Sequence, residues 1–173
     1  MSQSLSNDTV LQVSDVESDI VDQLLGRYGI TLELLPDAAP ITASFWGEPE
    51  AGVVGRQVFV RGDTPVHSML HEACHIICMS AERRDSLYRD AGGNDLEESA
   101  VCYLQVVLAD TMVGVGRARL MQDMDSWGYS FRFGSTECWF TDDADDARTW
   151  LIDEGLLTDE NQPVFRLRGA LAN

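Results

Sequence analysis

The five residues His71-Glu72-Ala73-Cys74-His75 form the pattern H-E-x-x-H, in which a helix presents two imidazoles to one metal ion. Helical residues four positions apart differ by about 40° around the axis and ~6 Å along it, so His71 and His75 can bind the same ion. Glu72 lies about 100° round from His71, where we expect a general base and not a ligand. Two histidines on an ordinary amphipathic helix are the alternative, so the flanking sequence has to decide.

The residues before the motif predict a strand followed by a helix. Apolar and polar positions partly alternate near the end of 53–61, as in a half-buried strand. The run 62–65 (GDTP) then interrupts it, with Thr64 as the expected N-cap and Pro65 at the first helical position. A helix is therefore predicted to continue to about Met79, with the motif near its middle and apolar residues available to pack it.

A third metal ligand is expected from a second helix. Residues 94–109 predict a helix of about four turns, capped by Asn94 or Asp95. Glu97 shares a helix face with the apolar residues three, four, seven and eleven positions later. We therefore predict Glu97 as the ligand and Glu98 as a capping or solvated charge. Either glutamate can also close a capping box with the residue three positions before it.

H-E-x-x-H followed by E-x-x-A on a second helix resembles the gluzincin metallopeptidases. The run Glu97-Glu98-Ser99-Ala100, with Tyr103-Leu104 and Val107-Leu108, is most similar to the compact ImmA/IrrE-type branch. The resemblance covers residues 53–110 and implies a zincin-like fold with Zn²⁺ held by His71, His75 and Glu97. The chain departs from that branch in having Leu108-Ala109-Asp110 where Met-Pro often closes the helix, and Leu104 where alanine is preferred.

The proposed ligands imply a reaction. Three protein ligands would leave one position on zinc for a water, whose pKa falls towards neutrality there. Glu72 would accept its proton and pass it to the leaving amine, so Glu72 is the predicted catalytic residue. The oxyanion needs a further donor, for which Tyr103, Tyr129 and Arg132 are candidates.

These features predict a zinc metallopeptidase that acts on a protein or peptide substrate. The alternative is an inactive zincin-fold module that binds metal or a protein partner. His67 and Cys78, which lie on either side of the motif, are not expected to bind the metal. His67 lies ~12 Å from His75 along the helix and is expected to be a polar residue near the helix start. Cys78 shares a face with His71, and burial is expected for it before metal binding.

Composition places the chain among intracellular globular proteins. Its 173 residues suit one domain, which we assign to 13–173 after a disordered N-terminus at 1–12. The N-terminus lacks the features of a signal peptide and no apolar run is long enough to span a membrane, so the cytoplasm is expected. A net charge of −17 argues against direct binding to nucleic acid or to an anionic membrane.

The remaining patterns complete an α+β prediction. We expect a short N-terminal β-sheet packed on the H-E-x-x-H helix and on the second, glutamate-bearing helix, as in a zincin-like single domain. The additional elements expected are helices at 14–27, 117–126 and from the acidic run 142–146 to Leu157, and strands at 31–35, 41–46 and 164–168.

Overall fold

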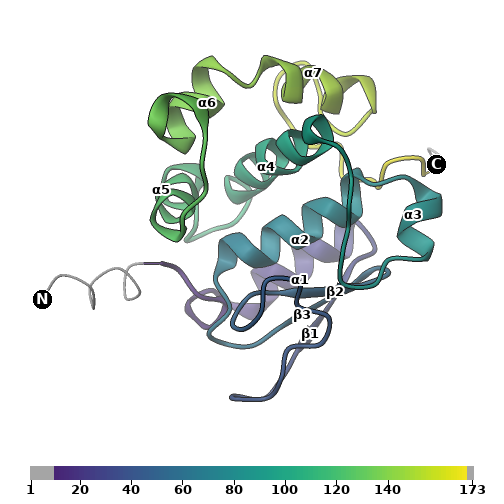
Figure 1. The fold of residues 1–173 in the computed structure, drawn as a ribbon, viewed down its shortest axis with the longest axis vertical. Helices are drawn as coiled ribbons and strands as arrows, with labels where there is room; N and C mark the ends of the chain where they lie inside the picture. The colour runs from purple at the N-terminus through teal and green to yellow at the C-terminus, as the bar shows by residue number, and fades with distance from the viewer. Residues whose placement is uncertain (1–9, 171–173) are drawn as a thin grey trace, which may run out of the picture.

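A computed structural model of the chain describes residues 10–170, which form an α+β domain with one small sheet and a larger set of helices (Figure 1). Most of the segment expected to be disordered, residues 1–9, lies outside the described residues. The last part of it is packed, because Val10 is buried and Gln12 forms an isolated β-bridge with Pro65. Among the described residues, no helix has the length and apolarity that a membrane crossing requires.

The sheet has three strands in the order β1-β3-β2, with β1 parallel and β2 antiparallel to β3. Their bounds are β1 Thr31–Leu34, β2 Gly52–Val54 and β3 Gln57–Val60. The single strand predicted over 53–61 is thus a hairpin, and Gly55 at its turn has a φ of +57°, which favours glycine.

Two predicted strands are absent from the structure. Segment 41–46 forms a loop that touches the sheet only through a bridge from Ser44 to Gly52. Segment 164–168 is irregular, and it is held by Arg168, whose backbone N–H donates to the carbonyl of Ile77. Both segments have enough apolar residues for a strand, but 41–46 pairs with the edge strand β2 at one residue only and 164–168 does not join the sheet.

The helices account for most of the domain. Their bounds are η1 Val13–Asp15, α1 Ser18–Arg27, α2 Val66–Cys78, α3 Ala81–Asp85, α4 Asp95–Ala109, α5 Arg117–Trp127, η2 Arg132–Gly134, α6 Thr136–Asp142 and α7 Asp145–Asp153. The helices predicted at 14–27, 117–126 and within 142–157 correspond to α1, α5 and α7. The short helices α3 and α6 were not predicted, and α7 ends at Asp153, before Leu157.

Helix α2 is the centre of the domain. It lies between the strands and α4, with α5, α6 and α7 beyond (Figure 1). All of its residues are buried, so the two histidines of the motif are held on a helix that is fixed on several sides. The predicted N-cap is wrong: the Thr64 hydroxyl accepts a hydrogen bond from the Arg61 N–H at 2.9 Å, and Pro65 takes the N-cap position.

Helix α4 packs along α2 and carries the glutamates. It begins as predicted after Asn94, whose side chain accepts a hydrogen bond from the Glu97 N–H at 2.9 Å. Every residue from Ala100 to Ala109 is buried, because α2 covers one side of the helix and α5 and α7 cover others. The first turn of α4 therefore places Glu97 and Glu98 in two different surroundings.

Candidate metal centre

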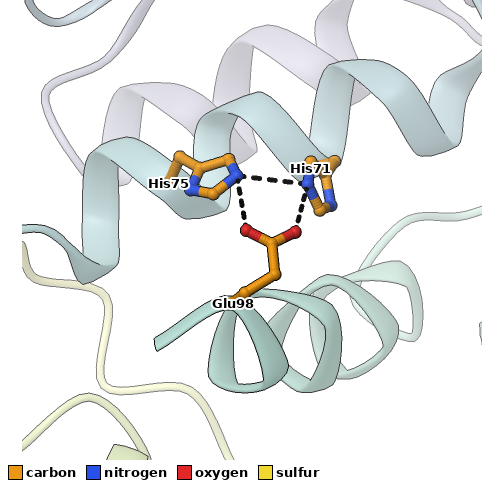
Figure 2. A group of neighbouring side chains, drawn as sticks. All are labelled: His71, His75 and Glu98. Atoms are coloured by element: carbon orange, nitrogen blue, oxygen red, sulfur yellow. Dashed lines mark hydrogen bonds and ion pairs between the residues drawn. The ribbon is translucent and has the colours of Figure 1, made fainter. Parts of the chain in front are cut away.

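The two histidines of α2 meet one carboxylate of α4. The Nε2 atoms of His71 and His75 lie 3.1 Å apart. One oxygen of Glu98 is 3.0 Å from the Nε2 of His71, and the other is 3.2 Å from the Nε2 of His75 (Figure 2). Three ligating atoms of the kinds that divalent metals prefer thus converge on one point from two helices.

These separations fit a zinc ion. In a tetrahedral shell, ligand atoms about 2.0–2.1 Å from zinc lie roughly 3.3–3.4 Å from one another. The two histidine nitrogens are 3.1 Å apart and lie 3.0 and 3.2 Å from the two different oxygens of Glu98, and one atom from each residue lies within 4.8 Å of the others, so the three side chains are close enough to share one ion. A His₂Glu set with an open fourth position is also the donor set of catalytic zinc sites.

The predicted third ligand, Glu97, does not lie at this cluster. Both of its carboxylate oxygens accept hydrogen bonds from Nη1 of Arg83, at 2.9 and 3.0 Å, and Arg168 lies 3.5 Å away. Its side chain is buried while that of Glu98 is about half exposed. The structure therefore places Glu98, and not the predicted Glu97, beside the two histidines.

The physical reason lies in the burial of α4. The prediction assumed that one face of the helix is packed and that the ligand lies on it. Since α4 is buried on nearly every side beyond its first turn, Glu97 can lie on an apolar face and still point away from the histidines. Residues 97 and 98 differ by about 100° around the axis, which is enough to separate a structural ion pair from the cluster.

Gln105 fixes the orientation of one histidine. Its side-chain amide donates to the carbonyl of His67 at 2.7 Å, which turns its oxygen towards the Nδ1 of His71, 3.1 Å away. That oxygen can only accept, so Nδ1 of His71 carries a proton, and Nε2, which faces Glu98, is the atom that would bind a metal ion once its own proton has left. Gln105 follows Glu98 by seven residues, which places both on the same face of α4. The prediction overlooked Gln105 because it placed Glu97 at the site.

Glu72 is close to the cluster without belonging to it. It is buried and lines the cavities on both sides of the histidines. Burial raises its pKa above the ordinary value, against the opposite influence of His71 and His75. The pKa of Glu98 moves the other way: burial would raise it, but hydrogen bonds from His71 and His75 hold it low. Glu98 is thus kept as a carboxylate, whereas the pKa of Glu72 lies above the ordinary value of a glutamate.

A cleft passes over the cluster. A cavity of about 490 Å³ lies on one side and one of about 210 Å³ on the other. Both are lined by the same four residues, Trp46, His71, Glu72 and Glu98. The larger cavity is closed by the aromatic end of α5 and the segment after it, and the smaller one by residues 89–93.

Of the three candidate oxyanion donors, the structure brings only Tyr129 to the cleft. The Tyr129 ring centroid is 5.9 Å from that of His71. Its hydroxyl contacts the Nδ1 of His67 at 3.2 Å and the amide of Gln105 at 3.4 Å. Tyr103 instead accepts a hydrogen bond from Asn161, and Arg132 forms an ion pair with Asp143.

His67 differs from the prediction, and Cys78 agrees with it. His67 is buried and packs against the ring of Trp127, with a centroid distance of 5.3 Å. Burial is the main cause that lowers its pKa to about 3, and the neighbouring His71 adds to the effect, so this imidazole is neutral. Cys78 is completely buried, as expected, and burial raises the pKa of its thiol.

Comparison with known proteins does not extend these findings. No protein-family model, curated protein or solved structure matches the chain. The resemblance to gluzincins accordingly rests on residues 71–75, because the E-x-x-A match at 97–100 takes Glu97 as the ligand and Glu97 lies away from the cluster. What the chain does has to be inferred from the cluster, from Glu72 and from the cleft.

Proposed function

We propose that this chain is a zincin-like, zinc-dependent metallopeptidase in which His71, His75 and Glu98 hold the ion. The observation that carries the proposal is the approach of the Glu98 carboxylate to both histidine Nε2 atoms (Figure 2). Glu72 lies beside this cluster in the wall of an open cleft, where substrate and a general base would meet. A His₂Glu shell favours zinc over magnesium or calcium, which prefer ligands that are all oxygen.

Each residue then has a defined task. A bound zinc ion would polarise the scissile carbonyl and lower the pKa of water. Glu72 accepts a proton on the cleft side and delivers it to the departing amine, a role that its raised pKa suits. Gln105 holds a proton on Nδ1 of His71, which leaves Nε2 as the atom that would bind the ion.

Tyr129 is the proposed donor to the developing oxyanion. It lines the larger cavity beside His71, and burial raises its pKa to about 12, so the hydroxyl keeps its proton at neutral pH. His67 and Gln105 hold this hydroxyl in place before substrate arrives. A fixed donor of this kind stabilises charge without having to reorganise during the reaction.

The shape of the cleft supports a peptide as the substrate. Cavities on both sides of the cluster allow a chain to extend past the reacting bond in two directions. The larger cavity, at about 490 Å³, has the volume of a ligand site. A protein or peptide segment in extended conformation is therefore the proposed substrate class.

The test is hydrolysis of a quenched fluorescent peptide library by zinc-loaded protein and by its Glu72→Gln variant. We expect both proteins to bind zinc, and the variant to lose at least about 10²-fold in rate because its amide cannot accept the proton. Glu33→Gln, which removes a charge from an exposed strand position, is the matched control. Zinc binding with no hydrolysis by the unaltered protein would support the inactive module instead. Equal rates for the unaltered protein and Glu72→Gln would exclude Glu72 as the base.

A further inference from the structure

The larger cavity contains a carboxylate that the proposed chemistry does not use. Glu50 lies in the wall of this cavity together with Trp46 and Trp127. It is half-buried, and one of its oxygens accepts a hydrogen bond from the indole N–H of Trp127 at 3.1 Å. The indole fixes the position of the carboxylate without neutralising its charge.

No basic side chain of residues 10–170 forms an ion pair with Glu50. Burial raises the pKa of this carboxyl, and the Trp127 hydrogen bond and His71 oppose that effect. A partly desolvated carboxylate without an ion-pair partner among the described residues is unfavourable unless a ligand supplies one. In this respect Glu50 differs from Glu97, which has two arginines beside it.

The surroundings of Glu50 suit a cation. Trp46 is 68% exposed and, like Trp127, lines the cavity, and indole rings attract a guanidinium or ammonium group. The net charge of −17 attracts cationic peptides over a longer range. The smaller cavity on the other side of the cluster contains Arg89 and so offers no comparable place for a positive group.

We propose that Glu50, Trp46 and Trp127 form a specificity pocket for an arginine or lysine side chain of a peptide substrate. The inference rests on the proposed function, because it assumes that a peptide occupies the cleft. An apolar side chain is a poorer occupant, since it would exclude water from the Glu50 carboxylate without replacing its hydrogen bonds. The indole rings would stack on the aliphatic part and the charged end of the basic side chain.

This pocket is tested by measuring peptide binding to a variant that does not hydrolyse the peptide. The zinc-loaded Glu72→Gln variant would be titrated with acetylated and amidated Ala-Ala-X-Ala-Ala peptides, where X is arginine, citrulline or norleucine. Blocked termini confine the only positive charge to X. We expect the arginine peptide to bind about tenfold more tightly than the citrulline peptide, as a partly exposed charged hydrogen bond allows. The difference should shrink at high salt.

A second substitution assigns the preference to Glu50. Adding Glu50→Gln should make the arginine and citrulline peptides bind equally, whereas adding Glu33→Gln should leave the preference intact. The melting temperature and zinc content of each variant show whether it is folded and loaded. The inference is overturned if no peptide binds, if arginine and citrulline peptides bind equally to the Glu72→Gln variant, or if the preference survives Glu50→Gln.

The two proposals can fail separately. If the unaltered, zinc-loaded protein prefers the arginine peptide but hydrolyses nothing, the peptidase proposal fails and the pocket stands. If it hydrolyses peptides with no preference for a basic residue, the pocket fails and the peptidase proposal stands.

Discussion

Replacing Glu97 should destabilise the protein while leaving its metal site intact. The Glu97 side chain is 6% exposed and accepts two hydrogen bonds from Arg83, with Arg168 3.5 Å away. Removing one partner of a fully buried ion pair costs about 3–5 kcal/mol. Arg83 and Arg168 are 37% and 27% exposed, so water can solvate part of the charge left behind. We therefore expect Glu97→Gln to lower the free energy of unfolding by about 2 kcal/mol.

For a domain of this size, about 2 kcal/mol corresponds to a fall in melting temperature of roughly 4–8 °C. Calorimetry or urea denaturation of the metal-free protein measures it, so that no bound ion contributes to stability. Glu33→Gln is the matched control, because it removes the same charge from an exposed strand position. We expect this control to change the stability of the metal-free protein far less. Equal stabilities for the Glu97→Gln variant and the unaltered protein, or loss of metal binding by that variant, would refute the assignment of Glu97 to a structural ion pair.

Two further substitutions test the residues around the cluster. Gln105→Met keeps the side-chain volume but cannot hold the proton on Nδ1 of His71, so zinc affinity should fall about 10–100-fold. Competition with a chromophoric chelator measures this affinity, and an unchanged value would exclude the role of Gln105. His67 is neutral in the folded protein, where its pKa is about 3, compared with 6.5 in the unfolded chain. Between these two pH values the unfolded chain binds one more proton than the folded protein, so stability falls as the pH drops from 6.5 towards 3. Between pH 7 and 5, urea denaturation of metal-free protein should show about 2 kcal/mol more loss for the unaltered chain than for His67→Asn. Equal losses for the two would contradict a neutral, buried His67.

The sequence was sufficient to predict the two helices that carry the cluster. Their start and stop signals are local: Asn94 caps α4, and the residues around Pro65 begin α2. The four-residue spacing of His71 and His75 also fixes their relation on one helix whatever packs around it. These features depend on residues within a few turns of one another, which is why they are visible without a structure.

The position of Glu97, the predicted third ligand, depends on contacts between distant segments. Glu97 is drawn away by Arg83 and Arg168, which lie on α3 and near the C-terminus, and no local pattern links those arginines to α4. The loop 41–46 likewise has an apolar composition, but part of it forms the rim of the cleft and not a strand. Glu50 and Trp46 could not be recognised for the same reason, since both lie in the irregular segment between β1 and β2, whose path brings them to the larger cavity.

Metal content is the measurement that tests the cluster most directly. Native mass spectrometry after exposure to zinc should find about one ion per chain in the unaltered protein and in Glu97→Gln. His71→Ala and Glu98→Ala should both lose it, because each removes one of the three atoms that converge in the structure. No zinc in well-folded unaltered protein, or zinc retained by Glu98→Ala and lost by Glu97→Gln, would contradict the site described here.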